Sequence, residues 1–98
     1  MMFIVLITYK KPLVIVDQHL AEHRMFLEKG YQQQLLMASG PQTPRTGGIL
    51  LSQCSDRHAL ETFLAQDPFL IHDVADYTII EFTPVKYHEA LRGFIESN

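Results

Sequence analysis

The chain has two ionisable side chains at helical positions where the surrounding pattern calls for an apolar residue. His23 lies inside the apolar arc of a helix expected to open at Asp17 and to end near residue 28 or 30. Asp67 continues the apolar arc of a second helix, expected over residues 55–67, at its C-terminal end. The helix dipole disfavours a carboxylate there, and burial without a partner is costly for both groups. The sequence therefore predicts a specific partner for each residue.

If both helices lie on one face of a sheet, His23 and Asp67 are close enough to be partners of each other. A carboxylate that holds an imidazole in one tautomer is the smallest unit of general acid–base catalysis near neutral pH. The alternative is structural, with each side chain paired to backbone groups or water and performing no chemistry. Asp76, at the start of the last expected strand, is the second candidate carboxylate for His23.

Residues 19–23 (His-Leu-Ala-Glu-His) match the H-x-x-E-H signature of a group of zinc peptidases. A chain of 98 residues is too short for such a peptidase, and so short a match arises by chance. In another interpretation His19 and His23, four residues apart on a helix, share a metal with Asp67 as third ligand, or one of them binds haem. We expect no metal and no other cofactor, and we assign His19 to the rim of a ligand pocket.

A loop expected over residues 40–48 contains two Gly-rich corners, two prolines and Arg45. Arg45 can hold a substrate carboxylate or remain in solvent, and the residues alone favour neither. Cys54, the single cysteine, ends an apolar strand and is expected to be a small buried hydrophobe. One cysteine excludes an intramolecular disulfide and fits a reducing compartment, so we expect a cytoplasmic protein.

The elements that must position these residues follow from the apolar runs and their breakers. Strands are expected over residues 2–9, 35–39, 48–54 and 74–82, and a short C-terminal helix over residues 87–97. The resulting order β-α-β-β-α-β predicts a ferredoxin-like α+β fold with a four-stranded antiparallel sheet. Right-handed crossovers place both helices on one face of that sheet. The other face carries Ile4, Leu6, Ile49 and Leu51, which predicts a homodimer formed through this open face.

Length and composition narrow the class of protein further. The chain has 98 residues, 47% of them hydrophobic, and a net charge of −3, which fits a single domain over residues 1–98. The acidic balance argues against general nucleic-acid binding, and the third strand lacks the stacking aromatic residues of an RNA-recognition domain. No apolar run is long enough for a membrane span, and we expect the apolar N-terminus to be a strand and not a signal peptide.

Four short segments resemble, in their order and spacing, the YCII-related (YciI-like) family of the dimeric α+β barrel group. They are His23 with the following Phe26 and Leu27, residues 38–41 (Ala-Ser-Gly-Pro), residues 47–49 (Gly-Gly-Ile) and residues 65–69 (Ala-Gln-Asp-Pro-Phe). The resemblance covers about residues 2–86 and implies a homodimer in which His23 and Asp67 form an acid–base pair. One departure is Leu20, since many similar proteins carry an arginine a few residues before the histidine. Relatives include a dehydrochlorinase of chlorinated hydroxyquinols.

On these grounds we expect a small cofactor-free enzyme in which His23 transfers protons and Asp67 orients it. The expected reaction is an elimination, isomerisation or dehydrochlorination of a small cyclic or aromatic molecule. Further substrate contacts are expected from His19, Ser39, Gly40, Pro41, Arg45 and Asp76. The alternative is a non-catalytic dimeric module that binds a ligand or assists a larger assembly. An open cavity with His23 at its wall favours the enzyme, and a filled apolar interior favours the module.

Overall fold

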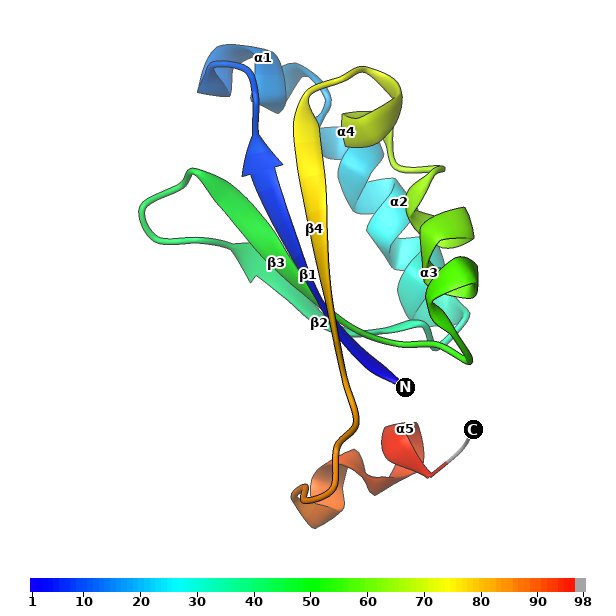
Figure 1. The fold of residues 1–98 in the computed structure, drawn as a ribbon. Coiled ribbons are helices and arrows are strands. Elements are labelled where there is room, and N and C mark those ends of the chain that lie inside the picture. Colours follow the sequence, from blue (N-terminus) through cyan, green and yellow to red (C-terminus); the bar gives the residue numbers. More distant parts are fainter. Residues whose placement is uncertain (97–98) are drawn as a thin grey trace.

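The structure, a computed structural model, describes residues 1–96, and its elements alternate in the predicted order (Figure 1). The strands are β1 (Met2–Tyr9), β2 (Leu36–Pro41), β3 (Gly47–Gln53) and β4 (Ala75–Phe82). The helices are α1 (Leu13–Gln18), α2 (Leu20–Gln32), α3 (Arg57–Leu64), α4 (Pro68–Ile71), the 3₁₀ turn η1 (Glu89–Leu91) and α5 (Arg92–Ile95). No helix in this part of the chain is long and apolar enough to cross a membrane.

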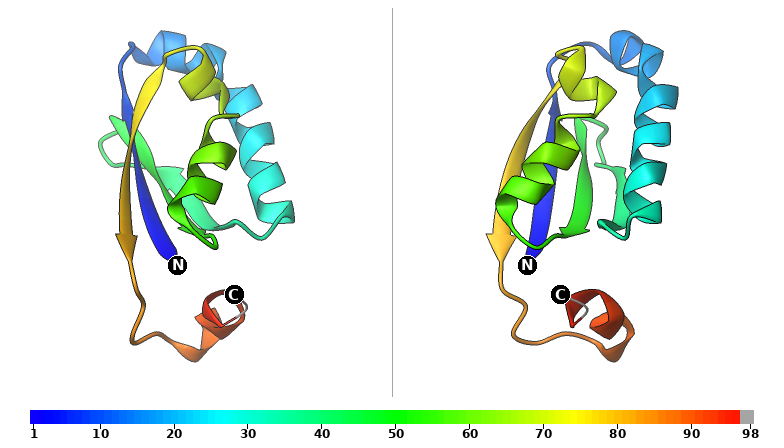
Figure 2. Two further views of the ribbon diagram at one scale, coloured as in Figure 1. Left: turned by 45° about the vertical axis from the view of Figure 1, so that its right-hand side comes forward. Right: turned by 90° about the vertical axis from the view of Figure 1, so that its right-hand side faces the viewer.

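The strands form one antiparallel sheet in the order β2-β3-β1-β4, which is the arrangement of the ferredoxin-like fold. The predicted α+β fold class is therefore confirmed. Burial alternates along β1, because Phe3, Val5 and Ile7 are buried whereas Ile4 and Leu6 between them are half-buried. Figure 2 shows the reason for this alternation: α2, α3 and α4 all lie on one side of the sheet.

The core fills the space between that covered face and the helices. Val16 of α1, Phe26 of α2 and Phe63 of α3 are buried in it. The rings of Phe26 and Phe63 stack with 4.5 Å between centroids, which joins α2 to α3. Gly30 allows the close packing here, since an added Cβ would lie 2.6 Å from Cζ of Phe63, whose ring would have to shift. The close approach of the two helices fixes the position of α2, which carries His23.

The opposite face of the sheet has no helix over it within residues 1–96 (Figure 2). Across the strands, Ile4 lies opposite both Leu51 and Ile80, so aliphatic side chains form rows on this face. Ile80 is 45% exposed and Phe82, further along β4, is 43% exposed. The prediction that one sheet face is both apolar and open is confirmed.

The first helical region is divided where a single helix was expected. α1 begins at Leu13, directly after Pro12, whose missing N–H and fixed φ suit a helix start. His19 then leaves helical geometry, with φ −110° and ψ 4°, so that it ends α1 and begins α2. The expectation that Asp17 opens the helix is wrong, because Asp17 lies inside α1 and its carboxylate accepts a hydrogen bond from Arg45.

The second helix also ends earlier than expected. α3 stops at Leu64, Asp67 is extended (φ −69°, ψ 126°), and Pro68 opens the short helix α4 that sequence reasoning missed. Asp67 is thus not at a helix C-terminus but is the N-cap of α4, and its side chain accepts the N–H of Phe69. A carboxylate is favoured at this end of a helix, so the expected conflict with the helix dipole does not exist.

The C-terminal helix expected over residues 87–97 forms only as η1 and α5, and residue 97 lies outside the described part of the chain. Phe94 and Ile95 border a small hollow together with Met1 and Met2. Figures 1 and 2 show this segment beyond the start of β1, apart from the helices that cover the sheet. It therefore takes no part in positioning His23 or Asp67.

Candidate functional site

His23 and Asp67 form the expected pair. Nδ1 of His23 lies 2.8 Å from Oδ1 of Asp67, and both residues are buried, with exposed fractions of 6% and 0%. His23 comes from α2 and Asp67 from the N-cap of α4, two helices that contact each other. The break before Pro68 makes this contact, because Asp67 leaves helical geometry there and directs its carboxylate to α2.

The hydrogen bonds of Asp67 determine which nitrogen of His23 is free. Oδ1 of Asp67 also accepts the backbone N–H of Phe69, at 2.9 Å. An ionised carboxylate can only accept hydrogen bonds, so Nδ1 of a neutral His23 must donate the proton in the bond that joins them. Nε2 then keeps its lone pair and is the nitrogen offered to a bound molecule.

Phe69 also fixes the plane of the imidazole. Its ring stacks on that of His23 with 4.0 Å between centroids and 6° between planes. Among residues 1–96, His23 is the only ion-pair partner of Asp67, whose Oδ2 is buried without a hydrogen bond. The pair is therefore held in one geometry before any ligand binds, which is what acid–base catalysis requires of its groups.

A cavity of about 460 Å³ lies beside His23, between α2, α4 and the covered face of the sheet. Its wall consists of His23 together with Ile7, Tyr9, Leu20, Arg24, Leu27, Ser39, Gly40, Pro41, Arg45, Gly48, Leu50 and Phe69. Asp67 is not part of the wall, so it can act on a ligand only through His23. The volume falls in the range of about 300–1,000 Å³ that is typical of small-molecule sites.

The structure places Ser39, Gly40, Pro41 and Arg45 on the cavity wall, as a substrate-binding role requires. The first three lie in β2, which continues to Pro41 although we expected it to end at Ser39, because Gly40 and Pro41 still pair with β3. Oγ of Ser39 shares a hydrogen bond of 2.6 Å with the hydroxyl of Tyr31. The end of β2 is thus a paired strand on the wall and not a loop.

Arg45 is held at the cavity by two contacts. It donates a hydrogen bond of 2.6 Å to Oδ1 of Asp17, and its guanidinium carbon lies 5.8 Å from the centre of the Tyr9 ring. The hydrogen bond from Arg45 lowers the pKa of the Asp17 carboxyl below its usual value. Because the Arg45 side chain remains 33% exposed, a ligand anion can still reach the guanidinium.

Asp76 does not belong to the cavity wall. It is exposed, and its carboxylate lies 3.6 Å from Nζ of Lys10. The carboxylate that contacts His23 is therefore that of Asp67, the first of the two candidates.

His19 is also absent from the cavity wall. Its ring stacks on that of His72, with 4.2 Å between centroids. His19, His23 and Asp67 do not surround a common point for a metal, because Nδ1 of His23 is bonded to Asp67 and His19 faces His72 instead. The described residues that could hold a metal together are His19, Glu22 and His72.

Two wall residues with polar groups, Tyr9 and Arg24, were not singled out from the sequence. Tyr9 shares the parity of Phe3, Val5 and Ile7 along β1, so strand alternation alone places it on the covered face. Arg24 directly follows His23 on α2, and the pattern of apolar residues gives no sign that it reaches the cavity.

Cys54 is the buried residue that we expected, with 2% of its surface exposed. Burial raises the pKa of its thiol. A neutral buried thiol is a poor nucleophile, so Cys54 is not a candidate catalytic group.

Two of three comparisons relate this chain to known proteins. The family model of the YCII-related domain matches residues 2–83. A solved structure with a similar fold is a 5-chloro-2-hydroxyhydroquinone dehydrochlorinase from Burkholderia phenoliruptrix AC1100 in complex with 2,5-dihydroxybenzoquinone. The match has a TM-score of 0.74 and 17% identity, and it covers 92% of this chain and 98% of that chain. A search of curated protein sequences finds no match.

The family match spans every strand of the sheet and both members of the His23–Asp67 pair. The structural match adds that the fold as a whole is shared with a dehydrochlorinase, although the sequences have diverged far. The segments that suggested the family all lie inside the matched range. This chain belongs to the YCII-related domain family.

Proposed function

We propose that this protein is a cofactor-free enzyme that performs acid–base chemistry on a small cyclic or aromatic molecule. The observation that carries the proposal is a buried, hydrogen-bonded His23–Asp67 pair whose histidine lines a cavity of about 460 Å³. An open cavity at His23 favours an enzyme over a ligand-binding module, since a module needs no oriented acid–base group.

In the proposed reaction, Nε2 of His23 removes a proton from a carbon next to a carbonyl group of the bound molecule, a carbon that a chlorinated hydroxyhydroquinone has in its diketo tautomer. The electron pair of the broken C–H bond forms a double bond. In an elimination such as dehydrochlorination that pair expels chloride, whereas in an isomerisation another carbon takes the proton back from His23. Asp67 keeps its charge throughout and stabilises the imidazolium that forms.

Cavity size and wall chemistry support a single-ring substrate with oxygen substituents. The similar dehydrochlorinase holds 2,5-dihydroxybenzoquinone, a molecule of this class. Here the guanidinium of Arg45 is suited to an ionised hydroxyl or carboxylate, and Tyr9 and Phe69 supply ring surfaces. Ser39, Gly40 and Pro41 close the cavity on the side of β2.

The test measures chloride release from 5-chloro-2-hydroxyhydroquinone and the binding of 2,5-dihydroxybenzoquinone by calorimetry. We expect both activities from the purified protein. His23→Ala should lower kcat by about 10²–10⁴-fold, which is the usual contribution of a general acid or base. Arg45→Ala should weaken quinone binding, because the guanidinium is the cationic group next to the Tyr9 ring on the wall.

His58→Ala is the matched control, since His58 is exposed on α3 and is not part of the cavity wall. Chloride release should be unchanged in this variant. An unchanged rate in His23→Ala would remove His23 from the mechanism. Quinone binding without turnover of any chlorinated phenol tried would support the non-catalytic module instead.

We also infer a homodimer that covers the open sheet face. The rows of aliphatic side chains across β3, β1 and β4, with Ile80 and Phe82 nearly half exposed, support this partner over solvent. Light scattering at micromolar concentration should give twice the mass of the chain, and Ile80→Asp should give the monomer mass. A wild-type monomer at that concentration would end the dimer proposal.

A further inference from the structure

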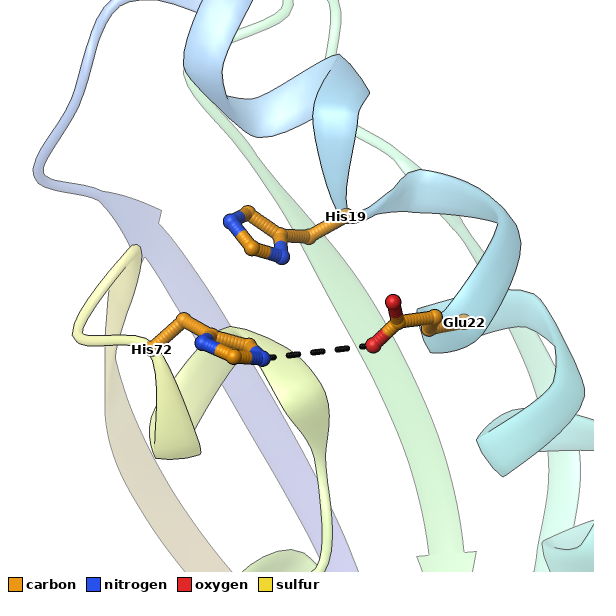
Figure 3. Close-up of side chains that lie close together, drawn as sticks. All are labelled: His19, Glu22 and His72. Carbon is orange, nitrogen blue, oxygen red and sulfur yellow. Dashed lines mark ion pairs between the residues drawn. The ribbon is translucent and has the colours of Figure 1, made fainter.

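We propose that His19, Glu22 and His72 form a zinc-binding site at the surface, separate from the cavity. One ligand atom from each residue lies within 4.8 Å of the other two. Figure 3 shows the His19 ring above that of His72 and the Glu22 carboxylate beside both. None of the three residues is part of the cavity wall.

Two segments far apart in the chain bring these residues together. His19 stands at the break between α1 and α2, and Glu22 follows in the first turn of α2. Residues three apart in a helix share a face, so the two side chains project in one direction. His72 is the C-cap of α4, which the Asp67–His23 bond holds against α2. The site therefore joins the start of α2 to the end of α4.

The clearest sign of an absent partner is Nδ1 of His19. This atom is buried and has no hydrogen bond within residues 1–96. In Figure 3, the ring nitrogen nearest to Glu22 points into the space between His72 and the Glu22 carboxylate. A buried imidazole nitrogen without a partner is costly, and a cation bound in this space would satisfy it.

Donor chemistry favours zinc over the hard cations. Two imidazole nitrogens and one carboxylate oxygen form a ligand set that zinc accepts, with a water molecule in the fourth position. Calcium and magnesium prefer oxygen ligands, and Glu22 is the one residue of these three that supplies an oxygen. Nε2 of His72 already lies 3.9 Å from Oε2 of Glu22, so the metal would replace a weak ion pair.

Zinc binding requires rotation of side chains and no change of the backbone. Zinc–ligand bonds of about 2.1 Å in a tetrahedron place the ligand atoms about 3.4 Å apart. The ligand atoms of the three residues now lie within 4.8 Å of one another, so they must move closer together. The rings of His19 and His72 are now stacked at 23°, so at least one must turn for both lone pairs to converge. The side chains of His72 and Glu22 are 46% and 60% exposed, so few protein contacts oppose their rotation.

Calorimetry with zinc chloride, on tag-free protein first treated with a chelator, tests the site. We expect one zinc per chain, and at least tenfold weaker binding in His72→Ala and in Glu22→Gln. His72 and Glu22 are exposed, so both variants should keep the circular dichroism spectrum of the wild type. Cobalt(II) should give the visible absorption of a tetrahedral complex in the wild type and not in His72→Ala.

Two measurements separate this site from the other histidines and from the proposed enzyme. His58→Ala should bind zinc as the wild type does, because His58 is exposed elsewhere on α3. The wild type should bind zinc whether or not it releases chloride, so a failure of catalysis and a failure of this site are distinguishable. Absence of stoichiometric binding in the wild type, or equal binding in His72→Ala, would overturn the proposal.

Discussion

Two histidines at the start of α2, four residues apart, have very different surroundings. His23 is 6% exposed and its Nδ1 is bonded to a carboxylate from the N-cap of α4. His19 faces the other end of α4, where His72 and Glu22 are exposed and Nδ1 of His19 has no hydrogen bond within residues 1–96. The same two helices thus hold one histidine with a carboxylate partner in the interior and one whose Nδ1 has no hydrogen bond in the described part of the chain.

The difference shows what burial adds to a pair of ionisable groups. At His23, the Phe69 ring and the Phe69 N–H fix both the imidazole and its carboxylate partner. At His19, the ring stacks on that of His72, whose side chain is 46% exposed. An interior site is therefore organised without a ligand, whereas a surface site needs the ligand to organise it.

The largest expected effect is the loss of stability in Asp67→Ala. The substitution removes the N-cap of α4 and leaves Nδ1 of His23 buried without its partner. The two losses together should lower the free energy of unfolding by about 2–5 kcal/mol. Urea unfolding followed by circular dichroism measures the change.

Asp56→Ala is the matched control for that substitution. Asp56 is the N-cap of α3 and accepts the N–H of Ala59, but it is exposed and has no histidine partner among residues 1–96. Its loss should cost about 1 kcal/mol, as expected for a cap alone. Equal losses in the two variants would show that the bond to His23 adds nothing to the stability of the fold.

A smaller effect is expected from zinc in the wild-type protein. A ligand that binds only the folded chain stabilises it by about 2.7 kcal/mol at 100 times its Kd. The midpoint of urea unfolding should therefore rise with zinc in the wild type and in His58→Ala, and should not move in His72→Ala. A rise of equal size in His72→Ala would place the metal elsewhere on the chain.

The contrast between the two histidines also marks how far the sequence could be interpreted. His23 was identifiable because it interrupts an apolar helical pattern. Asp67 was placed inward by extending a helix that in the structure ends at Leu64, so its burial was predicted but not its geometry. The extended geometry of Asp67 and the helix α4 could not be predicted, since both depend on how the chain packs after Pro68. Strand alternation places Tyr9 on the covered face of the sheet, but its position on the cavity wall is evident only from the structure.

The cluster of His19, Glu22 and His72 could not be predicted in the same way. The H-x-x-E-H motif holds His19 and Glu22, but it suggests His23 as their companion. His72 replaces His23 because the break at His19 and the turn after α4 together aim the two rings at each other. Such a contact depends on two irregular backbone positions, and neither has a periodic signal in the sequence.

The smallest expected effect concerns the same cluster without metal. In the presence of a chelator, Glu22→Gln and His72→Ala should each change the free energy of unfolding by less than about 0.5 kcal/mol, as is usual for exposed side chains. The weak Glu22–His72 ion pair, at 3.9 Å and in solvent, adds little. Urea unfolding in chelator measures both variants beside the wild type. A loss near that of Asp67→Ala would mean that the cluster already stabilises α4 without an ion, and the contrast between an organised interior site and a ligand-dependent surface site would no longer hold.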